Sequence, residues 1–265
     1  MAARHARLRV LGSGTSTGVP MLGCHCPVCS SEDPRDRRLR PSILLRHEGQ
    51  TAVIDTTPDF RAQALAANLD RLDAVLFTHS HADHIFGLDD VRQLNFAHPG
   101  PIPMHADPRT LADLRRVYQY VFANDYKVSA IPQISAQEIP PGTSPRPTIS
   151  AAGMAFEPIE VWHGALPITA YRFGRNAYVT DFSELPAPAM ERLRGLDLLI
   201  LDALRHRPHP THSSVANSLR LVRELAPRRA LFTHICHDLP HAETEAALPD
   251  HVRLAYDGLE LDVEL

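Results

Sequence analysis

The chain has 265 residues, of which 44% are hydrophobic, and a formal net charge of −4 at pH 7. This length can bury the core of one large α/β domain, and no Gly/Ser-rich linker divides it, so we expect a single domain over residues 1–265. The acidic balance and the lack of a long Lys/Arg run argue against a partner such as long nucleic acid. There is no run of about 18 apolar residues, and the first ten residues lack an apolar signal core. These features predict no membrane span and a cytoplasmic location.

The first half of the chain alternates between strand and helix patterns. We expect strands at 8–11, 42–46, 51–56, 74–77 and 102–106, and helices at 58–69, 87–96 and 108–122. Residues 12–20 form a Gly-rich loop without the Lys of a phosphate-binding P-loop. Residues 124–150 hold five prolines. They predict either an insertion of short strands and loops over the site or a plain surface excursion.

The second half continues the alternation. We expect strands at 155–162, 168–173, 177–181, 198–201, 229–233, 252–256 and 259–263, and helices at 188–194, 213–225 and 241–248. Groups of strands that alternate with helices fit an α/β fold in which two sheets pack face to face between helical layers.

The most informative segment is Thr78–His84, which reads THSHADH and follows a buried strand. Residues two apart in an extended chain point to the same side, so His79 and His81 can bind one ion. The chain must then turn, which allows Asp83 and His84 to reach a second ion. Imidazole nitrogens and carboxylate oxygens suit Zn²⁺, Mn²⁺ or Fe.

This segment resembles the metal-binding motif of the metallo-β-lactamase superfamily, whose fold is an αβ/βα four-layer sandwich. That resemblance requires a His, an Asp and a His at later strand ends, and His163, Asp181 and His234 follow apolar strands in this order. It implies a first metal on His79, His81 and His163, a second on Asp83, His84 and His234, and a bridge by Asp181.

Three cysteines lie close together, and the fourth is distant: Cys24, Cys26, Cys29 and Cys236. In a cytoplasmic protein such a cluster indicates metal binding rather than disulfides. Structural Zn²⁺ needs four ligands, and the fourth could be His25, Cys236 or His237. His25 would struggle to turn inward because a cysteine ligand stands on each side of it.

The CxCxxC pattern after the Gly-rich loop is similar to that of the bacterial phosphoribosyl 1,2-cyclic phosphate phosphodiesterases of phosphonate degradation. That resemblance implies one structural zinc on the three cysteines and His237, although the neighbouring Cys236 departs from the pattern and leaves a Cys₄ site possible. It also implies hydrolysis of a small cyclic or nucleotide-like phosphodiester by a hydroxide shared between two divalent ions, Mn²⁺ or Zn²⁺, and a homodimer.

A proton donor for the leaving group is expected in the loop after residue 202. Both this phosphodiesterase family and RNase Z place a catalytic-type His just before the following helix, and His212 matches that position. His206 and His209 are the alternatives. Asp83 is a candidate to orient the attacking water, and Arg205 to contact the phosphate.

Other members of the superfamily remain alternatives. RNase Z shares the ligand set, but its tRNA-gripping insertion is not visible here. A thioester or lactone hydrolase would be expected to show a TPGHTxG-type motif, from which Val161–Gly164 departs. A β-lactamase would be secreted, and a metal sensor or inactive scaffold would be expected to lose ligands.

Overall fold

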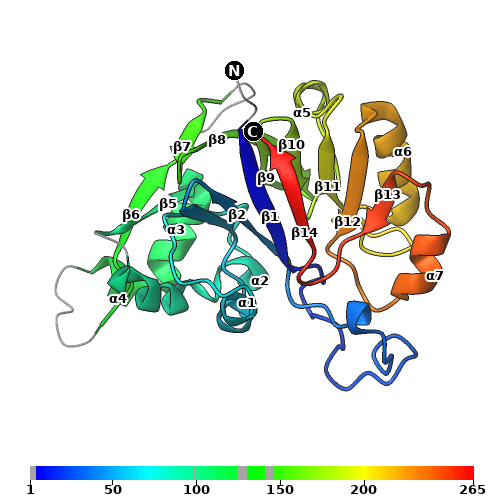
Figure 1. The fold of residues 1–265 in the computed structure, drawn as a ribbon, viewed down its shortest axis with the longest axis horizontal. Coiled ribbons are helices and arrows are strands. Elements are labelled where there is room, and N and C mark those ends of the chain that lie inside the picture. The colour runs from blue at the N-terminus through cyan, green and yellow to red at the C-terminus, as the bar shows by residue number, and fades with distance from the viewer. Residues whose placement is uncertain (1–3, 98–99, 124–129, 141–145) are drawn as a thin grey trace.

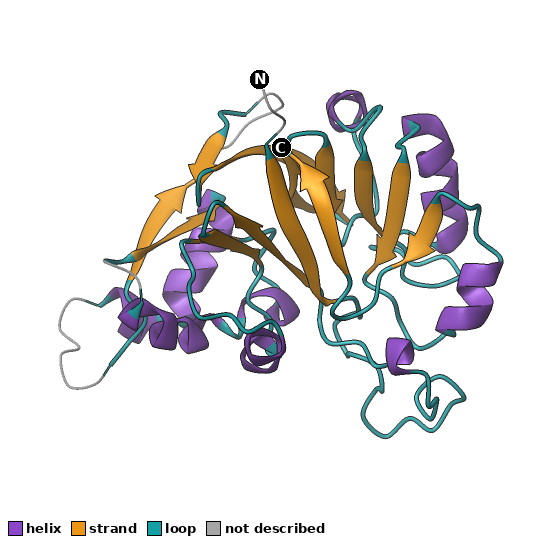
Figure 2. Ribbon diagram, in the orientation of Figure 1, coloured by secondary structure: helices purple, strands orange, loops and turns teal. Residues whose placement is uncertain are grey.

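A computed structural model describes residues 4–97, 100–123, 130–140 and 146–265. In this part of the chain two seven-stranded sheets pack face to face, with helices on the two outer faces (Figure 1, Figure 2). The architecture is the αβ/βα sandwich expected from the sequence.

The first sheet has the order β14-β1-β2-β3-β4-β5-β6. Its strands are β1 (His5–Gly12), β2 (Ser42–His47), β3 (Gln50–Ile54), β4 (Ala74–Leu76), β5 (Ile102–Ala106), β6 (Ile134–Glu138) and β14 (Glu260–Glu264). Strands β14 to β3 are antiparallel, and β3 to β6 are parallel.

The second sheet has the order β13-β12-β11-β10-β9-β8-β7. Its strands are β7 (Ile149–Ala151), β8 (Met154–His163), β9 (Leu166–Phe173), β10 (Asn176–Val179), β11 (Leu198–Asp202), β12 (Arg229–Thr233) and β13 (Val252–Leu254). Strands β7 to β10 are antiparallel, and β10 to β13 are parallel.

Strand alternation builds three stacked cores. On β4, Leu76 faces the core between the sheets, while Val75 packs under the helices of the first layer. On β11, Ile200 likewise faces the sheet interface, and Leu201 packs under the helices of the second layer. Because neighbouring residues of a strand point to opposite faces, a sheet covered on both sides needs continuous apolar runs, which these strands have.

The helices cover the outer faces in chain order (Figure 1). The first layer holds α1 (Phe60–Ala66), η2 (Leu88–Phe96), α3 (Pro108–Val117) and α4 (Gln119–Phe122), and the second holds α5 (Ala187–Arg192), α6 (Val215–Leu225) and α7 (His241–Ala246). Two short elements, η1 (Pro34–Asp36) and α2 (Ala82–Ile85), lie in loops. The helix expected over 108–122 is interrupted at Tyr118, whose backbone leaves the helical region, and the helix expected over 87–96 is a 3-10 helix.

The segment 124–150 is not a separate lobe where the structure describes it. Strand β6 completes the edge of the first sheet and β7 that of the second, so the segment joins the two halves of the sandwich. Residues 124–129 and 141–145, which the sequence prediction also covered, lie outside the described residues. No helix in the described ranges is long and apolar enough to cross a membrane.

Candidate metal centre

The candidate metal ligands follow strand ends on one side of the sandwich. His79 comes just after β4, and His81 has an extended backbone at the start of α2, which then carries Asp83 and His84. This is the turn that the sequence required between the two ligand pairs.

The other ligands come from the second sheet. His163 ends β8, while Asp181 and His234 follow β10 and β12. Asp181 and His234 both have left-handed backbones, with φ of 57° and 58°. Such conformations are uncommon for residues other than glycine and concentrate at functional sites.

The seven predicted ligands form two adjoining groups. Ligand atoms of His79, His81 and His163 lie within 4.8 Å of one another, as do those of Asp83, His84, Asp181 and His234. Asp181 also lies within that distance of His163 and His212. One carboxylate therefore reaches both groups.

The donor set fits metal ions. The Nε2 atoms of His79, His84 and His234 are buried without a hydrogen-bond partner among the described residues. A buried polar atom without a partner is costly, and divalent ions with imidazole and carboxylate ligands would satisfy all three. His84 Nε2 lies 3.3 Å from both Asp83 Oδ2 and Asp181 Oδ2, and the arrangement thus points nitrogen and oxygen donors at common positions.

Hydrogen bonds behind the ligands fix the ring orientations. His84 Nδ1 donates to Asp55 Oδ2 at 2.8 Å, and His163 Nδ1 donates to the Thr211 carbonyl at 2.8 Å. Both bonds leave Nε2 free to bind a metal. Asp55 and Thr211 were not predicted from the sequence; the one available signal was an Asp directly after the strand that ends at Ile54.

Electrostatic interactions show where positive charge is favoured. Burial opposes charge on His234, but the carboxylates of Asp181, Asp83 and Asp202 together outweigh it and raise the pKa of His234 to about 10. Burial would raise the pKa of Asp181, but His234 and His84 hold it well below its usual value. The second group is therefore a cation-attracting site.

His212 lies at the junction of the two groups. Its ring stacks on His234 with a centroid distance of 4.6 Å and lies 4.7 Å from the ring of His163. Its Nδ1 donates to Oδ2 of the fully buried Asp202 at 2.8 Å. Burial and then His234 lower the pKa of His212 to about 4, and burial raises the pKa of Asp202.

The two alternatives to His212 lie farther out. His206 is exposed, and the ring of His209 is 5.0 Å from that of His212. Arg205 donates to the carbonyls of Arg207 and Pro208 and thereby braces the loop. Its contact with a phosphate stays a prediction.

The cysteine cluster forms a second candidate site on the loop between β1 and β2, which projects from one end of the sandwich (Figure 1). The Sγ atoms of Cys24, Cys26 and Cys29 lie 3.2, 3.5 and 3.5 Å from His237 Nδ1. Cys236 is outside this group, and its Sγ accepts the Asp238 N–H. The geometry favours His237 over Cys236 as the fourth ligand.

The cluster also favours the thiolate, which is the metal-binding form, at Cys26. Burial raises the pKa of Cys29 to about 11, but the Cys29 N–H donates to Cys26 Sγ at 3.4 Å and lowers the pKa of Cys26 to about 7. Because the thiolate is the metal ligand, this shift suits zinc.

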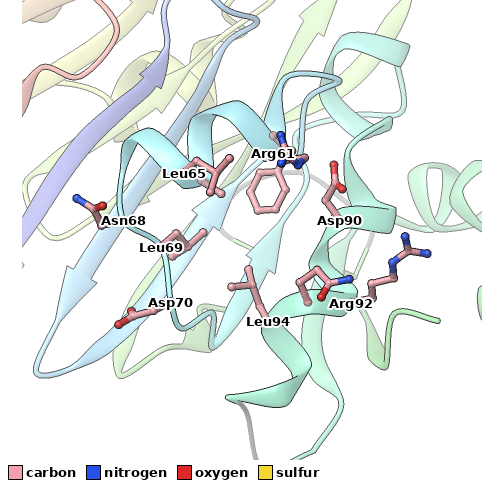
Figure 3. Close-up of a pocket in the computed structure, with 11 residues that line it drawn as sticks. Arg61, Leu65, Asn68, Leu69, Asp70, Asp90, Arg92 and Leu94 are labelled. Carbon is pink, nitrogen blue, oxygen red and sulfur yellow. The ribbon is translucent and has the colours of Figure 1, made fainter. Parts of the chain in front are cut away.

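A groove of about 710 Å³ lies elsewhere, between α1 and η2 (Figure 3). Its wall is apolar and its rim charged: Phe60, Leu65, Leu69 and Leu94 line the wall, and Arg61, Asp70, Asp90 and Arg92 stand around it. It contains none of the candidate ligands. The chemistry of the site is therefore located in the loops at the strand ends and not in this groove.

A family model described as the β-lactamase superfamily domain matches residues 50–235. The chain belongs to this superfamily. The match spans the segment from β3 to the end of β12 and includes all seven candidate active-site ligands.

Three proteins illustrate the similarity. A crystal structure described as a new diphosphatase from the PhnP family is 48% identical, with 98% of both chains covered and a TM-score of 0.91. An octanoyltransferase from Porphyromonas gingivalis is 38% identical over 97% of this chain, but the chain spans only 52% of that relative. Zn²⁺-bound PqqB from Methylobacterium extorquens shares the fold, with a TM-score of 0.72, 21% identity and coverage of 97% of this chain and 100% of that one.

These matches confirm the predicted superfamily and are consistent with the predicted resemblance to a phosphodiesterase of the metallo-β-lactamase fold. Together with the His and Asp cluster, they make the protein a metal-dependent hydrolase.

Proposed function

We propose that this hydrolase cleaves a small phosphodiester or a diphosphate linkage with two divalent ions. The observation that supports this proposal is the position of Asp181, which lies within 4.8 Å of members of both ligand groups. A shared carboxylate suits a two-metal site, and two-metal sites are widespread among enzymes that cleave phosphate esters.

In this proposal the ligands are divided as the resemblance implies. His79, His81 and His163 would hold one ion, Asp83, His84 and His234 the other, and Asp181 would bridge them. When bound, Mn²⁺ or Zn²⁺ ions supply a nucleophilic hydroxide at neutral pH and polarise a phosphoryl oxygen.

The remaining steps belong to side chains of this chain. Asp83, which is buried in the second group, orients the attacking water. The Nδ1 proton of His212 is engaged with Asp202, so Nε2 takes up the proton that the attacking water releases and then delivers it to the leaving oxygen. Asp202 holds the ring in that orientation. General acid catalysis of this kind contributes about 10²–10⁴-fold.

The neighbours support a small substrate. The protein that is 48% identical is described as a diphosphatase, which is a phosphoric anhydride hydrolase. The structure of the human tRNase Z short form shares the fold at only 16% identity, and the net charge of −4 disfavours long RNA.

A second candidate is hydrolysis of an acyl ester or thioester. It is favoured by the octanoyltransferase relative, which contains nearly the whole of this chain as about half of its own length. The two candidate reactions differ in the substrate atom that is attacked at the metal centre: phosphorus in the first and the acyl carbon in the second.

A substrate panel distinguishes them. The purified protein is assayed with Mn²⁺ and with Zn²⁺ on bis(p-nitrophenyl) phosphate, on a dinucleoside diphosphate and on an octanoyl thioester. We expect turnover of at least one phosphate substrate. Faster cleavage of the thioester, with no hydrolysis of either phosphate, would overturn the proposal.

A further inference from the structure

The loop between β11 and α6 is fixed against the candidate metal centre. Its base is closed by a bond of 2.9 Å from the Leu204 N–H to the Ser213 carbonyl. Near its end, the Thr211 carbonyl accepts the Nδ1 proton of His163 at 2.8 Å. A side chain on this loop is therefore presented at a defined place beside the ligands.

His209 is a constrained residue of this loop that the proposed mechanism does not use. Prolines 208 and 210 flank it, which fixes φ on both sides and restricts His209 itself to extended conformations. The Arg205 guanidinium donates to the Pro208 carbonyl at 3.1 Å and braces the chain just before the histidine.

The hydrogen bonds of His209 determine its tautomer. The Thr211 N–H donates to His209 Nδ1 at 3.3 Å, so Nδ1 is an acceptor and the ring proton lies on Nε2. Burial, followed by the neighbouring His212, lowers the pKa of His209, in agreement with a neutral ring. Within the described ranges Nε2 has no hydrogen-bond partner, and the side chain is half-buried.

The position of His209 relates it to the leaving group. Its ring lies 5.0 Å from that of His212, which in turn lies 4.7 Å from His163 and 4.6 Å from His234. His209 is thus one ring farther from the metal ligands than the residue that protonates the leaving oxygen. A leaving group that extends from that oxygen past His212 would come close to the ring of His209.

We propose that His209 determines leaving-group specificity by donating its Nε2–H to an acceptor oxygen, phosphoryl or hydroxyl, on the leaving group. This inference rests on the proposed phosphoric-ester hydrolysis. It predicts that the preferred leaving group is itself a phosphate or a polyol rather than a bare aryl or alkyl group.

Two substrates that share the attacked adenylyl group test this inference. The leaving group of di(adenosine-5′) diphosphate is AMP, which carries phosphoryl acceptors. The leaving group of adenosine 5′-(p-nitrophenyl phosphate) is p-nitrophenolate. The variant H209N keeps an acceptor near Nδ1 for the Thr211 N–H but has no distal donor. The variant H209Q carries an amide N–H near the position of Nε2.

We expect H209N to lose about 10- to 100-fold in kcat/KM on the diphosphate, the range for a hydrogen bond to a charged group, and to stay within about twofold of wild type on the nitrophenyl ester. H209Q should recover most of the lost rate, and both variants should retain wild-type metal content.

Equal losses on both substrates would show that His209 only supports the loop, and no loss on either would show that it makes no contact; both outcomes overturn the inference. Wild-type protein that cleaves neither substrate overturns the proposed phosphoric-ester hydrolysis itself, and the inference with it.

Discussion

The two candidate metal sites of this protein differ in what surrounds them. The active-site ligands come from both sheets and are buried at the strand ends, with His81 as the exposed member of the set. The cysteine site lies on one projecting loop, where Cys24, Cys26 and His237 are half-buried. Its local apolar cluster consists of Val19, Val28 and Cys29 with three partly buried neighbours.

This difference suggests that the active-site cluster serves catalysis, whereas the cysteine site stabilises its loop. The active-site cluster rests on three large apolar cores that do not need a metal to form. The loop has little core of its own, so a metal at its tip would replace the missing hydrophobic contacts. Substitutions at the first site should therefore change catalysis, and substitutions at the second should change stability.

The largest effect is expected at Asp181. The substitution Asp181→Asn keeps a residue that tolerates the left-handed backbone but removes the charge shared by both ligand groups. We expect loss of active-site metal and of measurable activity. The Tm in the presence of a chelator should match that of the wild type under the same conditions. Full activity with normal metal content would contradict the bridging role.

The next largest effect is expected at His212. His212→Ala should retain both active-site metals and lose about 10²–10⁴-fold in kcat on a diester with an alkyl leaving group. The loss should shrink for p-nitrophenolate, which needs no proton. His206→Ala, at an exposed position of the same loop, is the matched control. A near wild-type rate for His212→Ala on the alkyl diester would assign the proton donor elsewhere.

At the loop, Cys24→Ser should remove one equivalent of zinc and lower the Tm, by about 2–4 °C for each kcal/mol of lost stability. The active-site metals should stay, because no active-site ligand belongs to the loop. Cys236→Ser is the control and should keep the zinc, since Cys236 lies outside the cysteine tetrad, which consists of Cys24, Cys26, Cys29 and His237. Elemental analysis that shows loss of zinc from Cys236→Ser as well as from Cys24→Ser would favour the Cys₄ alternative.

The smallest effect concerns the base of the loop. Asp257 accepts hydrogen bonds from the Ser13 N–H at 2.9 Å and from the Leu39 N–H at 2.7 Å, and so joins both ends of the segment that carries the cysteines to the C-terminal part of the chain. Burial raises the pKa of Asp257 from 3.8 to about 6.

Since the folded state holds this proton more tightly than the unfolded state, the contribution of Asp257 is most favourable below about pH 4 and is lost as the pH rises to about 6. The change is at most about 3 kcal/mol and is reduced by solvent screening, because the residue is only partly buried. Urea unfolding at several pH values should show this decrease in wild type and a flatter profile in Asp257→Asn. Parallel profiles would exclude the effect.

The sequence predicted what depends on local pattern. Strands with apolar runs, and ligands immediately after them, follow from residue spacing; the fold and the convergence of the ligands were therefore predictable. Partners joined across the chain were not. Asp55 lies 29 residues before His84, and Thr211 lies 48 residues after His163. Such bonds between buried groups leave no periodic signal.

Whether His237 or Cys236 is the fourth ligand of the cysteine site also could not be predicted from the sequence. The two residues are adjacent in sequence, and only the path of the chain after β12 decides which of them faces the three thiols. The role of 124–150 also required the structure, because short edge strands broken by prolines do not show which sheet they join.

Because the active-site ligands come from both sheets, they become available in a fixed order while the chain is being translated. A nascent chain displays its first four active-site histidine and aspartate ligands by residue 84, yet it lacks the rest until β8, β10 and β12 have emerged. The cysteine tetrad is likewise incomplete until His237 is made, three residues after His234. Both sites should therefore acquire their metals late, when nearly the whole chain has been translated, and metal uptake would report that the two halves have come together.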